Sequence, residues 1–167
     1  MSEPRAGTPT PNDVPDRSGT LKFTCIGDAR KFVLGGHAVL TVVSSRTRDR
    51  LTFQVVRATP REGQATPPYF VSVLTGPNNT ADYTYLGLLT VGGDGRLWYR
   101  HGSRSIAVDS KSAKVASWFV RQLNRDLKEP TPLCDVWHLG YCGRCGRQLT
   151  TPKSIATGFG PHCAEKV

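Results

Sequence analysis

The sequence contains no long apolar run, and this absence removes one class of protein from consideration. No stretch of its 167 residues approaches the roughly 20 consecutive apolar residues that a membrane-spanning helix needs. The first twenty residues also lack the apolar core of a secretory signal peptide. We therefore expect a cytoplasmic protein that does not act on a membrane.

The sequence also lacks the short motifs that mark the common catalytic sites. It has no nucleophile elbow, no phosphate-binding glycine loop and no HExxH metal motif. His37 and His101 each stand beside a glycine, which is more typical of a loop than of a general base. We expect a protein without enzymatic activity and without a small-molecule substrate.

Negative charge is scarce, because 13 Asp and Glu face 22 Lys and Arg, and the formal net charge is +9. The excess is concentrated: residues 21–60 carry +5 and residues 101–128 carry +4. A surplus of Lys and Arg of this size raises the affinity for polyanions. Nucleic acid is therefore the first partner that we expect.

The chain divides into three parts. Residues 1–20 contain four prolines and neither an aromatic residue nor a periodic apolar pattern. Such a segment cannot bury enough apolar surface to offset the entropy of ordering, so we predict a disordered tail. Residues 21–129 should form a basic α+β domain, and residues 130–167 should form a small zinc-finger-like module.

The first half of the basic domain predicts an antiparallel β meander of about five strands. HAVLTVVSS and LTFQVV alternate with period two around the polar stretch RTRDR, as in a β-hairpin with a basic tip. PYFVSVLTG, DYTYLGLLTV and RLWYR follow, separated by the turn formers GPNN and GGDG. The predicted fold class is α+β, with this meander covered by one helix and followed by the C-terminal module.

The segment DSKSAKVASWFVRQLNRDLKEP predicts that helix, because its apolar residues recur on one face with helical spacing. The opposite face is basic and carries Lys111, Lys114, Trp118, Arg121 and Arg125. Two interpretations stay open. Either the cations only face water and the indole is partly buried under a neighbouring segment, or the cations bind phosphates and the indole stacks on a base.

The hairpin tip leaves the same choice open. Arg46, Arg48 and Arg50 either keep the tip soluble or form a second phosphate clamp.

Cysteine spacing gives the most specific signal. Cys142 and Cys145 have the CxxC spacing that lets two thiolates bind one ion, and Cys163 lies far enough downstream to return as a third ligand. A structural zinc site needs four ligands, so we predict Zn²⁺ with His138 as the fourth. Cys134 is the alternative, and His162 ranks last because it is adjacent to Cys163. A redox pair and free thiols are the competing interpretations of the CxxC spacing.

At these residues the sequence resembles a family of uncharacterised bacteriophage and actinobacterial proteins that end in a small zinc-finger-like domain of unknown function. Their pattern is H-x-G-x-C-x-x-C-G-R-x-L-T-x-P-x-S-I-x-x-G-x-G-P-x-C. Here it is met by His138, Gly140, Cys142, Cys145, Gly146, Arg147, Leu149, Thr150, Pro152, Ser154, Ile155, Gly158, Gly160, Pro161 and Cys163. The resemblance implies a phage or mobile-element origin and favours His138 as a ligand. It implies no activity.

Two functional hypotheses follow. The first is a nucleic-acid-binding accessory protein, in which Arg144 and Arg147 of the cysteine-rich segment add further phosphate contacts. The alternative is a protein-interaction module that acts on a host protein, with the zinc-finger-like segment or the Trp118 face as its docking surface.

Overall fold

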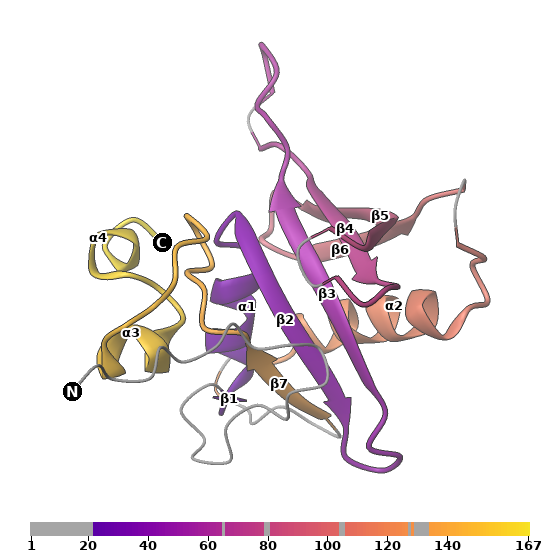
Figure 1. Cartoon of the computed structure of the whole chain (residues 1–167). Helices are drawn as coiled ribbons and strands as arrows, with labels where there is room; N and C mark the ends of the chain where they lie inside the picture. Colours follow the sequence, from indigo (N-terminus) through magenta and orange to yellow (C-terminus); the bar gives the residue numbers. More distant parts are fainter. Residues whose placement is uncertain (1–21, 65, 79–80, 104–105, 127, 129–133) are drawn as a thin grey trace.

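The structure of the chain is a computed structural model, shown in Figure 1. It describes residues 22–64, 66–78, 81–103, 106–126, 128 and 134–167. The predicted disordered tail lies outside the described residues.

One antiparallel sheet organises the described residues. Its strands are adjacent in the order β1-β7-β2-β3-β4-β5-β6. Their bounds are β1 Lys22–Phe23, β2 His37–Ser44, β3 Arg50–Arg57, β4 Tyr69–Leu74, β5 Tyr83–Val91, β6 Leu97–His101 and β7 Cys134–His138. The predicted meander corresponds to β2 through β6, so the α+β class is correct, but the sheet has seven described strands rather than about five.

The two additional strands could not be recognised from local pattern. β1 is only two residues long. β7 pairs antiparallel with β1 on one side and with β2 on the other, where Leu40 faces His138 and Ser44 faces Cys134. The sequence pattern places the β7 segment in the C-terminal module. Nothing in its own residues indicates that it pairs with β2, a strand almost a hundred residues earlier.

Four described helices accompany the sheet. They are α1 Ile26–Val33, α2 Lys111–Leu123, α3 Pro152–Thr157 and α4 Pro161–Ala164. The prediction of α2 is confirmed, and the Ser110 side chain caps it by accepting a hydrogen bond from the N–H of Ala113. The helix α1 was not predicted, since it is short and has a glycine in its first turn. In the described part of the chain no helix is both long and apolar enough to cross a lipid bilayer.

The helices α1 and α2 pack on the same face of the sheet, so a second helix joins the one that we predicted (Figure 1). Val33 of α1 and Phe119 of α2 both border the inward-facing side chains of β2 and β3, such as Leu40 and Phe53. Together these buried side chains form one hydrophobic cluster.

The C-terminal segment shares this core instead of having one of its own. The ring of Phe32 in α1 is surrounded by three others, with centroid distances of 5.1 Å to Phe23, 5.6 Å to His138 and 5.9 Å to Phe159. The N–H of His37 also donates to the carbonyl of Gly143 over 2.8 Å. Side chains on both sides of the predicted boundary between 21–129 and 130–167 therefore pack into one hydrophobic cluster.

Replacing Phe32 by alanine tests this shared packing. We expect Phe32→Ala to lower the free energy of unfolding by about 3–5 kcal/mol, because a large buried ring is removed and a cavity remains. Urea unfolding should be followed by circular dichroism for the sheet and by thiol accessibility for the cysteine loop. Both signals should shift together.

Phe70→Ala is the matched control, since this phenylalanine is 46% exposed and its removal should change the free energy of unfolding by no more than about 0.5 kcal/mol. An unchanged sheet transition in Phe32→Ala, with early exposure of the thiols alone, would show that the C-terminal segment folds as a separate module.

Candidate functional site

Three cysteine side chains converge in the C-terminal segment. The sulfur atoms of Cys142, Cys145 and Cys163 all lie within 4.8 Å of one another. The cysteine loop, residues 142–146, turns sharply, because Gly146 has a φ of 75° and donates its N–H to the carbonyl of Cys142. The short helix α4 brings Cys163 to this turn. These three thiols could hold a metal ion, as their spacing predicted.

The backbone around Cys142 stabilises the thiolate form that binds metals. Burial raises the pKa of Cys142, but the N–H groups of Gly160, Cys145 and Arg144 outweigh it and lower the pKa to about 7. The N–H of Gly160 lies 3.4 Å from the sulfur. The Arg144 guanidinium also lies 3.7 Å from the sulfur of Cys163, so positive charge lies beside the cluster.

His138 does not join the three cysteines. Its imidazole is fully buried, Nε2 donates to the carbonyl of Ile155 over 2.5 Å, and Nδ1 accepts from the N–H of Gly140 over 3.1 Å. Both ring nitrogens are therefore occupied by the backbone on either side of the cysteine loop. Burial lowers the pKa of His138, while the bond to Ile155 opposes this shift.

Cys134, the alternative ligand, lies at the opposite end of β7 from His138. Burial, with a smaller contribution from Asp135, raises the pKa of Cys134 to about 11, which disfavours the thiolate. Within the described residues, neither His138 nor Cys134 therefore joins the three cysteines as a fourth ligand.

His37 was interpreted as a loop histidine, and the structure places it against the cysteine loop. A β-carbon added to Gly146 would lie 2.4 Å from Cδ2 of His37, so only a glycine fits here. The sequence gives no signal of this contact between β2 and the loop.

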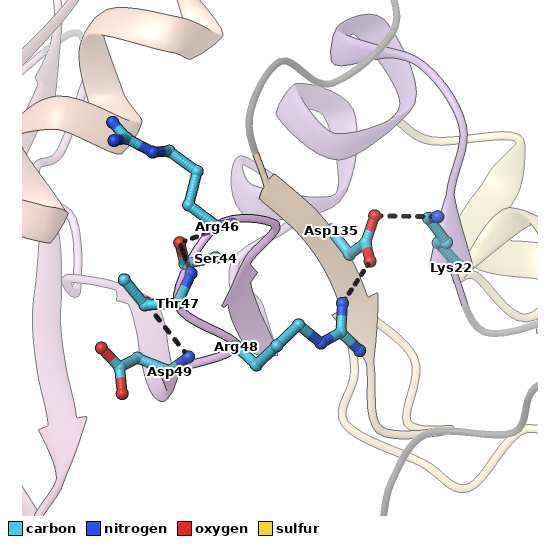
Figure 2. Close-up of polar contacts among 7 residues, drawn as sticks. All are labelled: Lys22, Ser44, Arg46, Thr47, Arg48, Asp49 and Asp135. Carbon is cyan, nitrogen blue, oxygen red and sulfur yellow. Dashed lines mark hydrogen bonds and ion pairs between the residues drawn. The ribbon is translucent and has the colours of Figure 1, made fainter.

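The arginines of the hairpin tip do not form a single clamp. Figure 2 shows Arg46 directed away from Arg48, which extends toward β7. There Asp135 pairs with Lys22 over 2.8 Å and with Arg48 over 3.7 Å. Arg50, the third predicted member, is the exposed first residue of β3.

At the start of α2, Lys111 forms an ion pair with an acidic residue. Lys111 lies 2.6 Å from Asp49 of the hairpin tip, and this hydrogen-bonded pair is the main reason why the pKa of Asp49 is lowered. Trp118 is half-buried and lines a groove of about 320 Å³ together with Val42 and Leu51. The structure thus favours the interpretation in which this indole packs against the core instead of standing free.

Several arginines gather around the C-terminal end of α2, and the sequence pattern indicates only some of them. The described residues that line a hollow of about 570 Å³ include four arginines and a single carboxylate, that of Asp94. We call this site the arginine hollow and define it by Arg30, Arg96, Arg121 and Arg125. The last two were predicted nucleic-acid contacts, whereas the first two come from distant parts of the sequence.

Polar contacts hold this hollow in shape. Arg30 of α1 donates to the carbonyl of Leu123 over 3.2 Å and also to the carbonyl of Gly95. The side-chain amide of Asn124 both accepts from the N–H and donates to the carbonyl of Leu97, each over 2.8 Å. The end of α2 is thereby fixed to the turn before β6 and to β6 itself.

The remaining predicted contacts lie elsewhere. Lys114 lines a second hollow beside Tyr99 and His101, which Arg121 also borders. Arg144 and Arg147 are exposed on the cysteine-rich segment. Neither of these two arginines is among the described residues that line the arginine hollow.

Residues 138–167 match a family of unknown function, DUF6011. No curated protein matches the chain. No solved structure matches it either. The family match covers the cysteine loop, α3 and α4, and it does not extend to the meander or to α2.

Metal binding can be tested with Co²⁺ as a spectroscopic probe. We expect the full-length protein to give thiolate-to-cobalt absorption, and each of Cys142→Ser, Cys145→Ser and Cys163→Ser to lower the affinity by more than about 100-fold, because a ligand is removed. Cys25→Ser and Cys134→Ser are matched controls that should keep the absorption, since both thiols lie outside the group. Equal loss in all five variants would contradict the site.

The protonation of His138 gives a second test. Its folded-state pKa lies below the usual value of about 6.5, so the unfolded state binds the proton more readily. The neutral His138 ring therefore makes its full contribution to the free energy of unfolding above pH 6.5. This contribution falls as the pH drops below that value. Nuclear magnetic resonance of the ring should show a neutral imidazole protonated on Nε2 and a titration midpoint below 6.5. A midpoint above 6.5, or a metal-bound nitrogen, would contradict the buried position.

Proposed function

We propose that the protein is a nucleic-acid-binding accessory protein of a phage or mobile element, with a structural zinc ion in its cysteine loop. The single observation that carries the binding function is the arginine hollow. Arginine has a planar fork of donors that matches phosphate, and several of these forks around one hollow provide a site for a nucleic-acid backbone.

The choice of zinc rests on the donor set. Three sulfur ligands, two from a tight turn and one from α4, suit zinc better than magnesium or calcium, which prefer oxygen. When bound, the ion supplies a rigid link between the cysteine loop and α4, with no role in chemistry. The fourth ligand remains a prediction. For His138 to serve, it would have to exchange one of its two backbone hydrogen bonds for a zinc–nitrogen bond.

The charge distribution supports phosphate binding at the end of α2 more than at its start. Lys111 and Arg48 each pair with a carboxylate, which reduces the positive potential at the hairpin tip. Among the described residues that line the arginine hollow, four are arginines and one, Asp94, is acidic; its Oδ1 accepts the backbone N–H of Arg96.

The second candidate is a protein-interaction module. The apolar groove that includes Trp118 favours it, because a half-buried indole beside aliphatic side chains suits an apolar side chain of a partner. A steep salt dependence of binding to an oligonucleotide separates the two candidates, since it is expected only of the first.

Fluorescence anisotropy of labelled oligonucleotides at several salt concentrations tests the proposal. Removing both cations in Arg121→Ala/Arg125→Ala should weaken binding and reduce the slope of log affinity against log salt. The expected reduction is roughly 0.7 to 0.9 for each phosphate that the variant no longer neutralises.

The double variant Arg61→Ala/Lys153→Ala is the control, because it removes the same charge from exposed positions outside the hollow. Equal weakening by both double variants would indicate attraction by net charge alone. No binding by the unaltered protein, even at low salt, would rule out the proposed function.

A further inference from the structure

Aromatic side chains are exposed on one face of β4, β5 and β6. This outer face points away from α1 and α2, and its side chains have no role in the proposed function as stated above. Phe70 is 46% exposed, Tyr85 is 38% exposed and Trp98 is 55% exposed. In the described part of the chain these are the exposed aromatic side chains, and they come from three adjacent strands. We call Phe70, Tyr85 and Trp98 the aromatic face.

Strand register makes this face continuous. Phe70 faces Leu88, and Leu88 faces Arg100 on the next strand. The rings of Phe70 and Tyr85 meet edge to face at 6.3 Å. Trp98 faces Thr90, two residues along β5 from Leu88, so one strand separates the indole from the phenylalanine.

A glycine keeps Tyr85 on this face. A β-carbon at Gly102 would lie 2.5 Å from Cε1 of Tyr85, so a larger residue at position 102 would displace the ring. The backbone of Gly102 is held in place by its N–H, which donates to the carbonyl of Leu86 over 2.9 Å.

Cations border the aromatic face. Arg100 is exposed and shares a row with Leu88 and Phe70. The guanidinium of Arg96 lies 5.0 Å from the ring centroid of Trp98, and Arg96 also lines the arginine hollow. The aromatic face and the arginine hollow therefore meet at Arg96, immediately before the edge strand β6.

This juxtaposition specifies the chemistry of the ligand. A partner that covers both surfaces must present flat apolar rings to Trp98 and Phe70 and negative charge to the arginines. Unpaired bases joined by phosphates have both properties. In a duplex the base faces are already stacked on one another, so a duplex can offer its phosphates to the arginines but no open base face to the aromatic rings.

We propose that the protein binds single-stranded nucleic acid across the edge strand β6, with bases stacked on the aromatic face and phosphates at the arginine hollow. The proposal rests on the proposed function and narrows it. Because the rings contact bases and the arginines contact phosphates, we expect a specific pattern of losses. Removing a ring should weaken the binding of single strands alone, whereas removing an arginine should weaken the binding of single strands and of duplexes.

The test uses the metal-loaded full-length protein with a labelled oligothymidine and with a labelled duplex of the same length. We expect Trp98→Ala to lower the affinity for the single strand by roughly 5- to 150-fold, the range for the loss of one stacked base. The salt slope and the duplex affinity should not change. Trp98→Phe should retain most of the affinity, because it keeps a stacking ring.

Val167→Ala is the control, since Val167 is an exposed apolar residue that lies outside the β4–β6 strands and does not line the arginine hollow. It should bind both oligonucleotides as the unaltered protein does. Thermal unfolding of each variant shows whether the fold is retained, which is expected at such exposed positions.

Three results would overturn the inference in distinguishable ways. If Arg121→Ala/Arg125→Ala weakens binding but Trp98→Ala does not, the proposed function stands and the stacking surface does not. If the unaltered protein binds no oligonucleotide, both are wrong. If Trp98→Ala abolishes self-association in sedimentation but leaves oligonucleotide binding intact, the aromatic face joins two copies of the chain.

Discussion

The packing around Phe32 is the constraint on which the rest of the structure depends. This fully buried ring at the end of α1 touches Phe23 of β1, His138 of β7 and Phe159 beyond α3. Gly143 of the cysteine loop has no room for a side chain, because a β-carbon there would lie 2.6 Å from the ring. One side chain thus positions the cysteine loop against the sheet, so the candidate metal site is part of the same folded unit as the meander.

The two ends of α2 differ in how much unneutralised positive charge they carry. The net charge of +9 alone does not show this difference. Along α2, Lys111 near one end pairs with Asp49, whereas Arg121 near the other contributes to a hollow shared with three further arginines. Exposed ion pairs add little stability, but they reduce the charge that a ligand experiences. The basic character that matters for binding is therefore set by which side chains the sheet and helices bring together, and Arg96 connects it to the aromatic face.

Local sequence signals predicted the parts of this architecture that depend on neighbouring residues. Apolar runs separated by turn formers indicated β2 to β6, apolar residues with helical spacing indicated α2, and the cysteine spacing predicted that Cys142, Cys145 and Cys163 approach one another. Long-range features could not be predicted in this way. The pairing of β7 with β2, the burial of His138 against Phe32, the arginine hollow and the aromatic face all depend on residues far apart in the chain, and single-sequence periodicity contains no information about them.

Ultraviolet crosslinking of the metal-loaded protein to a single-stranded oligonucleotide, with the modified residues identified by mass spectrometry, tests the proposed binding mode most directly. We expect adducts on the aromatic face, at Trp98 foremost, because its ring is the most exposed and lies beside the arginine hollow. Adducts confined to residues 142–163, or to the hairpin tip at residues 46–50, would show that nucleic acid binds elsewhere and would contradict this binding mode.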